Sequence, residues 1–203
     1  MLVALKPILD KVGIKRLVIS TYQAVSGTGA PAIEELDKQV KAYAANKELK
    51  YSVYPHQIAF NCLPHIDSFL DNGYTKEEMK MVNETRKIFE DDTIGITATA
   101  VRVPVYYGHS ESVNIETKSK ITVAEIKELL ATAPGVKLVD DPANLKYPLA
   151  TDCAGSFETL VGRIREDESI ENGINLWVVS DNILKGAALN AVQIAETFIA
   201  EYK

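Results

Sequence analysis

Helix-forming stretches, with apolar side chains three to four positions apart, occur five times along the chain. This spacing is typical of helices that bury one face. Two of them are predicted to begin at capping boxes, in which a threonine precedes a glutamate by three positions: Thr75 with Glu78, and Thr122 with Glu125. The predicted helices cover residues 1–13, 32–46, 76–90, 123–133 and about 182–202.

Between these helices, β-branched and aromatic residues, or alternating apolar and polar residues, indicate strands. Residues 96–105 and 110–117 are separated only by the short YYGH segment and are predicted to be neighbouring strands. Asn172–Gly173 predicts a hairpin-type turn between the last two strands. Clustered antiparallel strands flanked by helices favour an α+β fold in one domain, residues 1–203. The predicted strands cover residues 14–25, 49–55, 96–105, 110–117, 136–140, 159–167 and 173–181.

Charge and composition exclude two classes of partner. The 28 acidic residues outnumber the 22 basic ones, and no basic cluster offsets this excess, so a nucleic-acid partner is not expected. Charged or glycine residues break each apolar stretch before the roughly 18 residues that a membrane span needs. The opening segment is interrupted by Lys6, Asp10 and Lys11, which indicates an amphipathic helix rather than a signal peptide. Two distant cysteines, Cys62 and Cys153, fit a cytoplasmic chain with reduced thiols.

The stretch AVRVPVYYGHSES places Arg102 and His109 seven residues apart among apolar and hydroxylated residues. In one interpretation, Arg102 pairs with a carboxylate on a sheet face and His109 is an ordinary loop residue. In the other, Arg102 receives a substrate carboxylate, because a planar guanidinium binds carboxylates with two hydrogen bonds. His109 would then move protons near neutral pH. Structural charges are commoner than catalytic ones, so this stretch alone favours the first interpretation.

Three further motifs have a structural and a functional interpretation. SGTGAPA, residues 26–32, matches a dinucleotide-binding pattern, but the polar residues before it and the absence of an acidic residue after the next predicted strand argue against that fold. A glycine-rich turn that brings the backbone close to a ligand stays open. Cys62 and His65 suggest a thiol nucleophile or half a zinc site, but the apolar neighbours of Cys62 favour a buried, inert thiol. Glu77 and Lys80 are either a surface ion pair or binding groups for a ligand with both charges.

Several long segments together resemble the aspartate-semialdehyde dehydrogenase family, in the family's order and through essentially the whole chain. These segments are STYQAVSGTGAPA, TKEEMK with NETRKIF, TAVRVPVYYGHSES, VGRIRED and VVSDNILKGAALNAVQIAE. The resemblance implies a mixed, largely antiparallel sheet with helices packed on one face, like the C-terminal domain of the glyceraldehyde-3-phosphate dehydrogenase type. It also implies reduction of L-aspartyl 4-phosphate to the semialdehyde with NADPH, on the route to lysine, threonine, methionine and isoleucine.

The resemblance assigns roles to individual residues. It implies that His109 is the acid/base, that Gln23 lines the thioester site, and that Arg102 grips the substrate α-carboxylate. Glu77 is expected to face the substrate ammonium and Lys80 the phosphate. Gly27 and Asn182 lie in segments that approach the nicotinamide in the family. The family's dinucleotide-binding domain and its Asn-Cys-x-Thr nucleophile segment have no counterpart in this sequence, and Asn61-Cys62 is followed by Leu-Pro.

We therefore expect a dehydrogenase fragment that has no activity alone. The alternatives are a non-catalytic binding or dimerisation module and, less favoured, a relative of N-acetylglutamyl-phosphate reductase, whose acylated substrate nitrogen does not suit Glu77. The resemblance implies a homodimer or higher homo-oligomer formed through the sheet. It also implies that the C-terminal helix, residues 183–203, packs on the missing cofactor domain. Its predicted apolar stripe is Leu184, Ala187, Ala188, Ala191, Ile194, Ala195 and Phe198.

Overall fold

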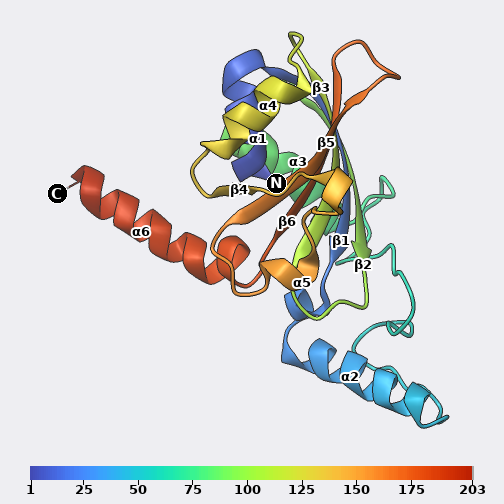
Figure 1. Ribbon diagram of the computed structural model, residues 1–203. Coiled ribbons are helices and arrows are strands. Elements are labelled where there is room, and N and C mark those ends of the chain that lie inside the picture. Colours follow the sequence, from blue (N-terminus) through green and yellow to red (C-terminus); the bar gives the residue numbers. More distant parts are fainter. Residues whose placement is uncertain (203) are drawn as a thin grey trace.

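One mixed six-stranded sheet organises the fold in the computed structural model, which describes residues 1–202 (Figure 1). The strands are β1 (Ile14–Gln23), β2 (Gly95–Arg102), β3 (His109–Thr117), β4 (Val136–Leu138), β5 (Thr159–Asp167) and β6 (Gly173–Ser180). The helices are α1 (Leu2–Val12), α2 (Ala30–Ala44), α3 (Lys76–Phe89), α4 (Val123–Ala131), α5 (Ala150–Cys153) and α6 (Leu189–Tyr202). Short 3₁₀ turns lie at Val25–Thr28 and Pro142–Asn144, and a π turn at Leu184–Ala188.

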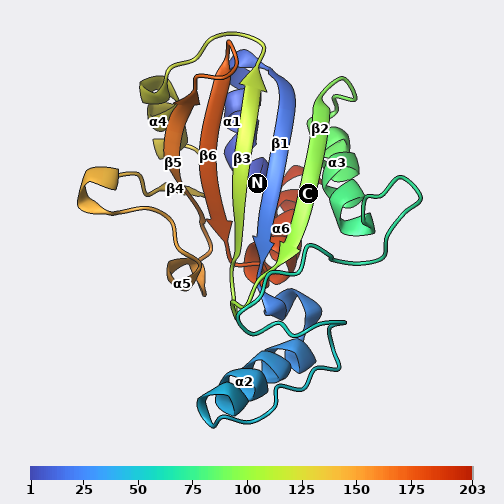
Figure 2. The same cartoon turned by 90° about the vertical axis from the view of Figure 1, so that its right-hand side faces the viewer.

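The strand order is β2-β1-β3-β6-β5-β4. The central pairs β1–β3, β3–β6 and β5–β6 are antiparallel, whereas the outer pairs β1–β2 and β4–β5 are parallel. Figure 2 looks onto the open face of the sheet and shows α1 and α4 behind it, with α3 beside β2. The prediction of an α+β fold with a mixed, largely antiparallel sheet and helices on one face is therefore confirmed.

Two strand predictions were wrong. The strands predicted at 96–105 and 110–117 are not neighbours, because β1 lies between β2 and β3 and pairs with both. The connection after Arg102 therefore crosses the end of β1 instead of making a hairpin. Residues 49–55 form no strand, because the Glu35 carboxylate of α2 accepts the backbone N–H groups of Ser52, Val53 and Tyr54.

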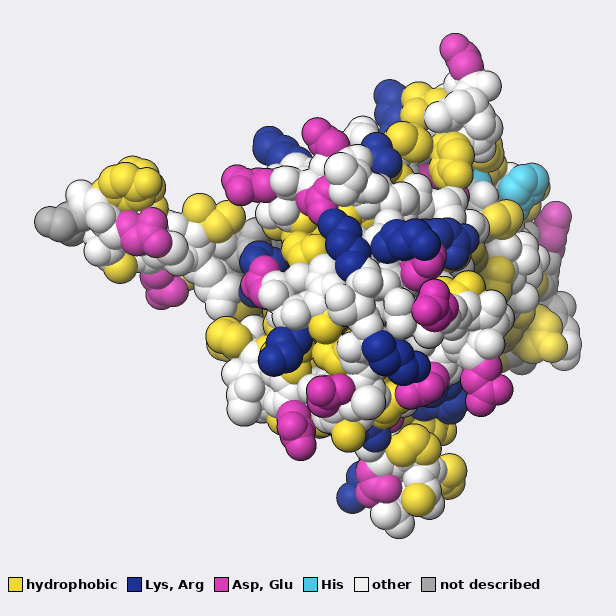
Figure 3. All heavy atoms as spheres, turned by 90° about the horizontal axis from the view of Figure 1, so that it is seen from above, with side chains coloured by type: hydrophobic (Ala, Val, Ile, Leu, Met, Phe, Trp, Pro, Cys, Tyr) yellow, Lys and Arg dark blue, Asp and Glu magenta, His cyan; other side chains and the backbone are white. Residues whose placement is uncertain are grey.

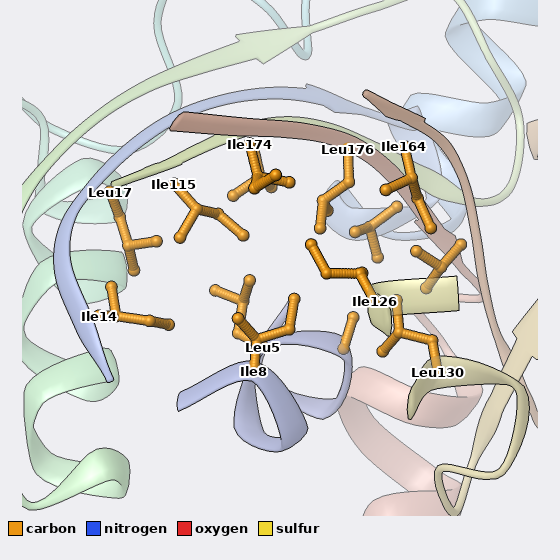
Figure 4. Close-up of a cluster of buried hydrophobic side chains, with 14 of the residues drawn as sticks. Leu5, Ile8, Ile14, Leu17, Ile115, Ile126, Leu130, Ile164, Ile174 and Leu176 are labelled. Atoms are coloured by element: carbon orange, nitrogen blue, oxygen red, sulfur yellow. The ribbon is translucent and has the colours of Figure 1, made fainter. Parts of the chain in front are cut away.

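Helix α1 and the sheet enclose the main core. Leu5 and Ile8, one helical turn apart, point from α1 toward Ile115 and Ile174 on the sheet (Figure 4). All four side chains are essentially inaccessible to solvent. Burial of each stabilises the fold by about 2 kcal/mol, so this layer holds α1 against β3 and β6.

Helices α3 and α4 begin where the capping boxes predict. Thr75 and Thr122 accept backbone N–H groups at Glu78 and Glu125, and each glutamate side chain accepts the N–H of its threonine. Both boxes satisfy amide groups that the first helical turn leaves unpaired. The start of α3 is thus fixed, which matters because its first turns carry Glu77 and Lys80.

Helix α6 extends away from the sheet, and none of its described residues is buried (Figure 1). Its exposed apolar side chains include Ile194 and Phe198 of the predicted stripe, together with Val192 and Ile199. The space-filling view shows this helix protruding, and it shows basic side chains lying among acidic ones on the upper face (Figure 3). No helix within residues 1–202 has the length and apolar character to cross a bilayer.

Replacement of Ile8 by alanine should lower the free energy of unfolding by about 3 kcal/mol, because it leaves a cavity between α1 and the sheet. The matched control is Ile199→Ala on exposed α6, which should change it by less than about 0.5 kcal/mol. Urea unfolding of the three proteins measures both values. Equal losses in the two variants would contradict the placement of α1 in the core.

Candidate functional site

Two neighbouring strands end and a third begins at the same end of the sheet, which brings three polar side chains together. Gln23 and Arg102 are paired residues at the ends of β1 and β2. Tyr22 pairs with Ser110, so the antiparallel register places Gln23 opposite His109 at the start of β3. Paired residues share a face, and Gln23 and Arg102 are buried on the helix-covered side. The strand register therefore assembles this edge of the site.

A cavity of about 850 Å³ opens at this edge, between the strand ends, α3 and the segment that follows β6. All seven residues that the sequence analysis singled out as site residues line it. They are Gln23, Gly27, Glu77, Lys80, Arg102, His109 and Asn182.

The Arg102 guanidinium is buried and points into the cavity, with 5% of the residue exposed. Its Nη1 donates to the Ala24 carbonyl at 2.6 Å, and the Tyr54 ring lies 6.0 Å from the guanidinium carbon. Within residues 1–202 no carboxylate forms an ion pair with Arg102, and its buried Nε has no hydrogen-bond partner. Burial lowers the pKa of the guanidinium from its ordinary value. The interpretation of Arg102 as the partner of a structural carboxylate was therefore wrong.

Helix α3 adds one negative and one positive side chain to the cavity. Glu77 Oε2 lies 3.6 Å from Lys80 Nζ, and Gln23 Nε2 donates to Glu77 Oε1 at 3.2 Å. Glu78, on the buried side of the same turn, accepts the backbone N–H of Ala100 on β2 at 2.9 Å. This buried contact anchors α3 to the outer strand, so Glu77 and Lys80 stay at the cavity.

The His109 imidazole is held through its ring. The backbone N–H of Ala24 donates to Nδ1 at 3.1 Å. A Cβ atom at Gly27 would lie 3.3 Å from His109 Nε2 and 3.0 Å from Arg102 Nη1, so only glycine leaves the space between these groups open. Burial, and then the positive charge of Arg102, lower the pKa of His109 to about 4.

The segment after β6 holds the backbone next to His109 in place. Asn182 Oδ1 accepts the backbone N–H of Gly108 at 3.0 Å, and its Nδ2 donates to Ser26 Oγ at 3.0 Å. Gly108 has a φ of 88°, and a Cβ there would lie 2.5 Å from the Cys153 sulfur. Position 108 therefore accepts only glycine, and the backbone that carries His109 is fixed on both sides.

Sequence reasoning missed one residue that lines the cavity and two that contact its lining segments. Glu111 lines it two positions after His109, and the period of two along β3 could have indicated that both share a face. Asp181 is buried and accepts the backbone N–H groups of Ile183, Leu184 and Gly155. Tyr54 reaches Arg102 from an irregular loop, and no periodic pattern indicates this contact.

The thiol interpretation needs one correction. Cys62 is exposed, whereas its apolar neighbours predicted a buried thiol. The segment is irregular, so residues adjacent in sequence do not share one buried face, and Phe60 is exposed as well. His65 stacks on Phe69 instead of lining the cavity. Throughout residues 1–202, no three His, Cys, Asp or Glu side chains gather as metal ligands would. Of the SGTGAPA motif, Gly27 alone reaches the cavity.

Comparison with known proteins identifies relatives of this chain. Residues 5–185 match the family model of the semialdehyde dehydrogenase dimerisation domain. An aspartate-semialdehyde dehydrogenase of Aquifex aeolicus is 58% identical over 99% of this chain and 59% of its own length. The chain thus spans about 60% of the length of the curated relatives that it matches.

Solved structures agree with this match. The crystal structure of aspartate semialdehyde dehydrogenase II from Vibrio cholerae, complexed with ASA, is 50% identical with a TM-score of 0.97. It covers all of this chain, which in turn covers 60% of that protein. The Candida albicans enzyme, crystallised with NADP, has 24% identity and a TM-score of 0.70 over 98% of this chain and 55% of its own, a likeness in fold alone.

The low pKa of His109 predicts a pH-dependent stability. The unfolded chain binds a proton at His109 near its ordinary pKa of 6.5, whereas the folded chain binds it only near 4. Stability should therefore fall as the pH drops from 6.5 toward 4, by at most about 3 kcal/mol and less because the ring is only half-buried.

Unfolding free energies of the wild type and His109→Gln across this range measure the effect. The difference between the two proteins should shrink or reverse toward low pH, because glutamine does not titrate. His56→Gln, on an exposed loop, is the control and should keep the wild-type profile. Parallel curves for the wild type and His109→Gln would contradict the prediction.

Proposed function

Because the chain belongs to the family of semialdehyde dehydrogenase dimerisation domains, we propose that it is the C-terminal part of an NADPH-dependent aspartate-semialdehyde dehydrogenase. The whole enzyme would convert L-aspartyl 4-phosphate to L-aspartate 4-semialdehyde in the cytoplasm, in the biosynthesis of lysine, threonine, methionine and isoleucine. One observation carries the proposal. A single cavity gathers a buried, unpaired arginine, a histidine, a glutamine and an oppositely charged pair, which suit an amino-acid phosphate.

Each charge in the cavity has a counterpart on that substrate. The buried Arg102 lacks a carboxylate partner within the described chain, so the substrate α-carboxylate can supply one. Glu77 suits the ammonium, and Lys80, which is half-exposed, suits the phosphate. When the ligand binds, Glu77 and Lys80 would exchange their contact with each other for contacts with the ammonium and the phosphate at its two ends. An acylated nitrogen offers no charge to Glu77, which disfavours the N-acetylglutamyl-phosphate type.

We expect the reacting carbonyl to lie beside His109 and Gln23, which both line the cavity. In the proposed reaction a cysteine thiolate displaces phosphate from the acyl phosphate and forms a thioester, which is then reduced to a hemithioacetal. NADPH supplies the hydride of that reduction when it is bound. The resulting hemithioacetal breaks its C–S bond, which releases the aldehyde and restores the thiol. We assign His109 the role of the acid/base that takes the proton from the thiol and serves the hemithioacetal, and we expect Gln23 to line the site beside the thioester.

The cofactor role proposed for Gly27 and Asn182 fits their surroundings in part. Gly27 leaves open the space in front of His109 and Arg102 that a side chain would fill, so a nicotinamide could approach there. Asn182 lines the cavity while its amide is hydrogen-bonded to Ser26 and Gly108. Asn182 would therefore shape the nicotinamide side of the cavity and hold the Ser26 turn in place.

We also propose that two copies pair through the open face of the sheet. No helix covers this face in Figure 2, and the rings of Tyr22 and Trp177 meet on it at a tilted angle with centroids 5.4 Å apart. Tyr147 and Leu149 lie beside them around a hollow of about 410 Å³. A surface with aromatic side chains of this kind is typical of subunit interfaces. A chain that only dimerises would need this face and not the cavity.

Replacement of Arg102 by alanine in the full-length enzyme should cost about 2–5 kcal/mol of transition-state stabilisation, because it removes a charge-assisted contact from a buried site. Lysine at this position should recover only part of the loss. Lys47→Ala, in the exposed turn after α2, is the control and should leave kcat/KM unchanged. The assay follows phosphate-dependent NADP reduction with aspartate semialdehyde. Wild-type kcat/KM for the alanine variant would make Arg102 a structural residue.

The 203-residue chain alone should show no such NADP reduction, because the proposed reaction needs a nucleophilic cysteine that neither exposed Cys62 nor buried Cys153 provides. Burial raises the pKa of the Cys153 thiol to about 11, which disfavours the reactive thiolate. The same assay, run on this chain and on its Cys62→Ser variant, measures this. Activity that Cys62→Ser abolishes would make Cys62 the nucleophile and contradict the prediction.

A further inference from the structure

The guanidinium of Arg102 is supported in a way that leaves hydrogen-bond donors free at its edge. Its N–H groups lie in one plane, and a carboxylate binds them in that plane through two parallel hydrogen bonds. Nη1 donates to the Ala24 carbonyl, whereas the buried Nε has no partner within residues 1–202. A second carboxylate from the protein would occupy this edge, but a group packed on the flat face of the guanidinium would leave it open.

The ring of Tyr54 lies on that flat face. The guanidinium carbon of Arg102 is over the ring, 6.0 Å from its centroid. The negative face of an aromatic ring attracts a cation and uses none of its N–H groups. Tyr54 is half-buried and is not among the residues that line the cavity, so any effect on a ligand there must pass through Arg102.

Helix α2 fixes the loop that carries Tyr54. Glu35 Oε2 accepts the backbone N–H groups of Ser52 and Val53 at 2.6 and 2.7 Å, and Oε1 accepts that of Tyr54 at 3.4 Å. Glu35 is 6% exposed, and a buried carboxylate without donors is costly. Movement of the loop away from α2 would break these hydrogen bonds, so Glu35 restrains the backbone of Tyr54.

The loop is also attached beside the arginine itself. The Tyr54 hydroxyl donates to Thr28 Oγ1 at 2.9 Å, next to Gly27, whose Cβ position would lie 3.0 Å from Arg102 Nη1. Further along the chain, Leu63 and Arg102 exchange two backbone hydrogen bonds of 2.9 and 2.8 Å. The segment from Tyr54 to Leu63 therefore contacts both the side chain and the backbone of Arg102.

We propose that Tyr54 is a positioning residue for Arg102, and that Glu35 on α2 fixes the loop that carries its ring. This inference rests on the proposed function, in which Arg102 binds the substrate α-carboxylate. The ring holds the guanidinium while its edge stays free, so the carboxylate meets donors that are already oriented. Affinity for the substrate then depends on two residues that lie outside the cavity lining.

Kinetics of the full-length enzyme test this role. Tyr54→Ala should raise the KM for aspartate semialdehyde by about tenfold, as expected for the loss of a partly desolvated cation–π contact. The kcat should change by less than about threefold, because Arg102 holds the carboxylate in both the ground state and the transition state. Tyr54→Phe keeps the ring and should stay within about threefold of the wild-type KM.

Tyr51→Ala is the matched control, since Tyr51 is an exposed tyrosine three residues earlier in the same loop. Neither KM nor kcat should change in this variant. A wild-type KM for Tyr54→Ala, or equal increases in the alanine and phenylalanine variants, would overturn the proposal.

The contact can also be measured on the 203-residue chain, without activity. In ¹H–¹⁵N correlation spectra of the ¹⁵N-labelled chain, the Nε–H signal of Arg102 is the one that Arg102→Lys removes. This proton should exchange with water about tenfold faster or more in Tyr54→Ala, but not in Tyr54→Phe or Tyr51→Ala, because the alanine uncovers the buried guanidinium. An unchanged rate in Tyr54→Ala would overturn the proposal even if the full-length enzyme is an active dehydrogenase. Absence of dehydrogenase activity in the full-length wild type would instead contradict the proposed function.

Glu35→Gln tests the link to α2. The amide offers one acceptor oxygen where the carboxylate offers two, so the loop should be held less firmly. The KM should rise by about threefold or more when Tyr54 is present, and should not rise further when Glu35→Gln is added to Tyr54→Ala. Additive increases in the double variant would overturn the role of Glu35 as the residue that acts through Tyr54.

Discussion

The pairing of β1 with both β2 and β3 is the constraint on which the rest of the site depends. It places the ends of three strands side by side, and neighbouring strands lie only about 4.8 Å apart. Gln23, Arg102 and His109 therefore reach one space from one face of the sheet. A slip of one residue in either pairing would turn the affected side chains to the opposite face. The same backbone hydrogen bonds that stabilise the sheet thus set the geometry of the cavity.

Burial of Arg102 requires compensation elsewhere in the fold, because a charge inside a protein is costly unless it is hydrogen-bonded. The Ala24 carbonyl and the face of Tyr54 provide part of this compensation, and Glu77 adds a favourable charge. Glu78 contributes indirectly, because its carboxylate ties α3 to β2 through the Ala100 amide. The cation, the helix that faces it and the strand that carries it therefore form one connected unit, in which each element limits the freedom of the others.

The sequence predicts local structure well here and non-local structure less well. Helical spacing and the capping boxes at Thr75 and Thr122 predict α3 and α4 correctly, because these signals are contained within a few residues. The insertion of β1 between β2 and β3 has no such local signal. The failure at residues 49–55 has a similar cause, since a single distant carboxylate, that of Glu35, captures the amides that a strand would have used.

The site shows the same difference between what local sequence predicts and what the whole fold determines. The residue types at positions 102 and 109 indicate carboxylate binding and proton chemistry, and the structure brings both side chains to one cavity. The orientation of the His109 ring, however, depends on a hydrogen bond from one backbone N–H, that of Ala24. Backbone direction is set by the whole sheet and is not encoded by the identity of residue 24. Residue types therefore indicate which chemistry is available, and the fold determines the form in which each group offers it.

The two residues that follow β6 connect the last helix to the histidine. Asp181 accepts the first backbone N–H groups of the helical segment that leads into α6, and Asn182 holds Gly108 immediately before His109. The direction in which α6 leaves the sheet and the position of His109 therefore depend on the same two neighbouring residues, Asp181 and Asn182. A surface that packed on the exposed apolar side chains of α6 and changed the direction of this helix would therefore also bear on the residues that hold the backbone of His109.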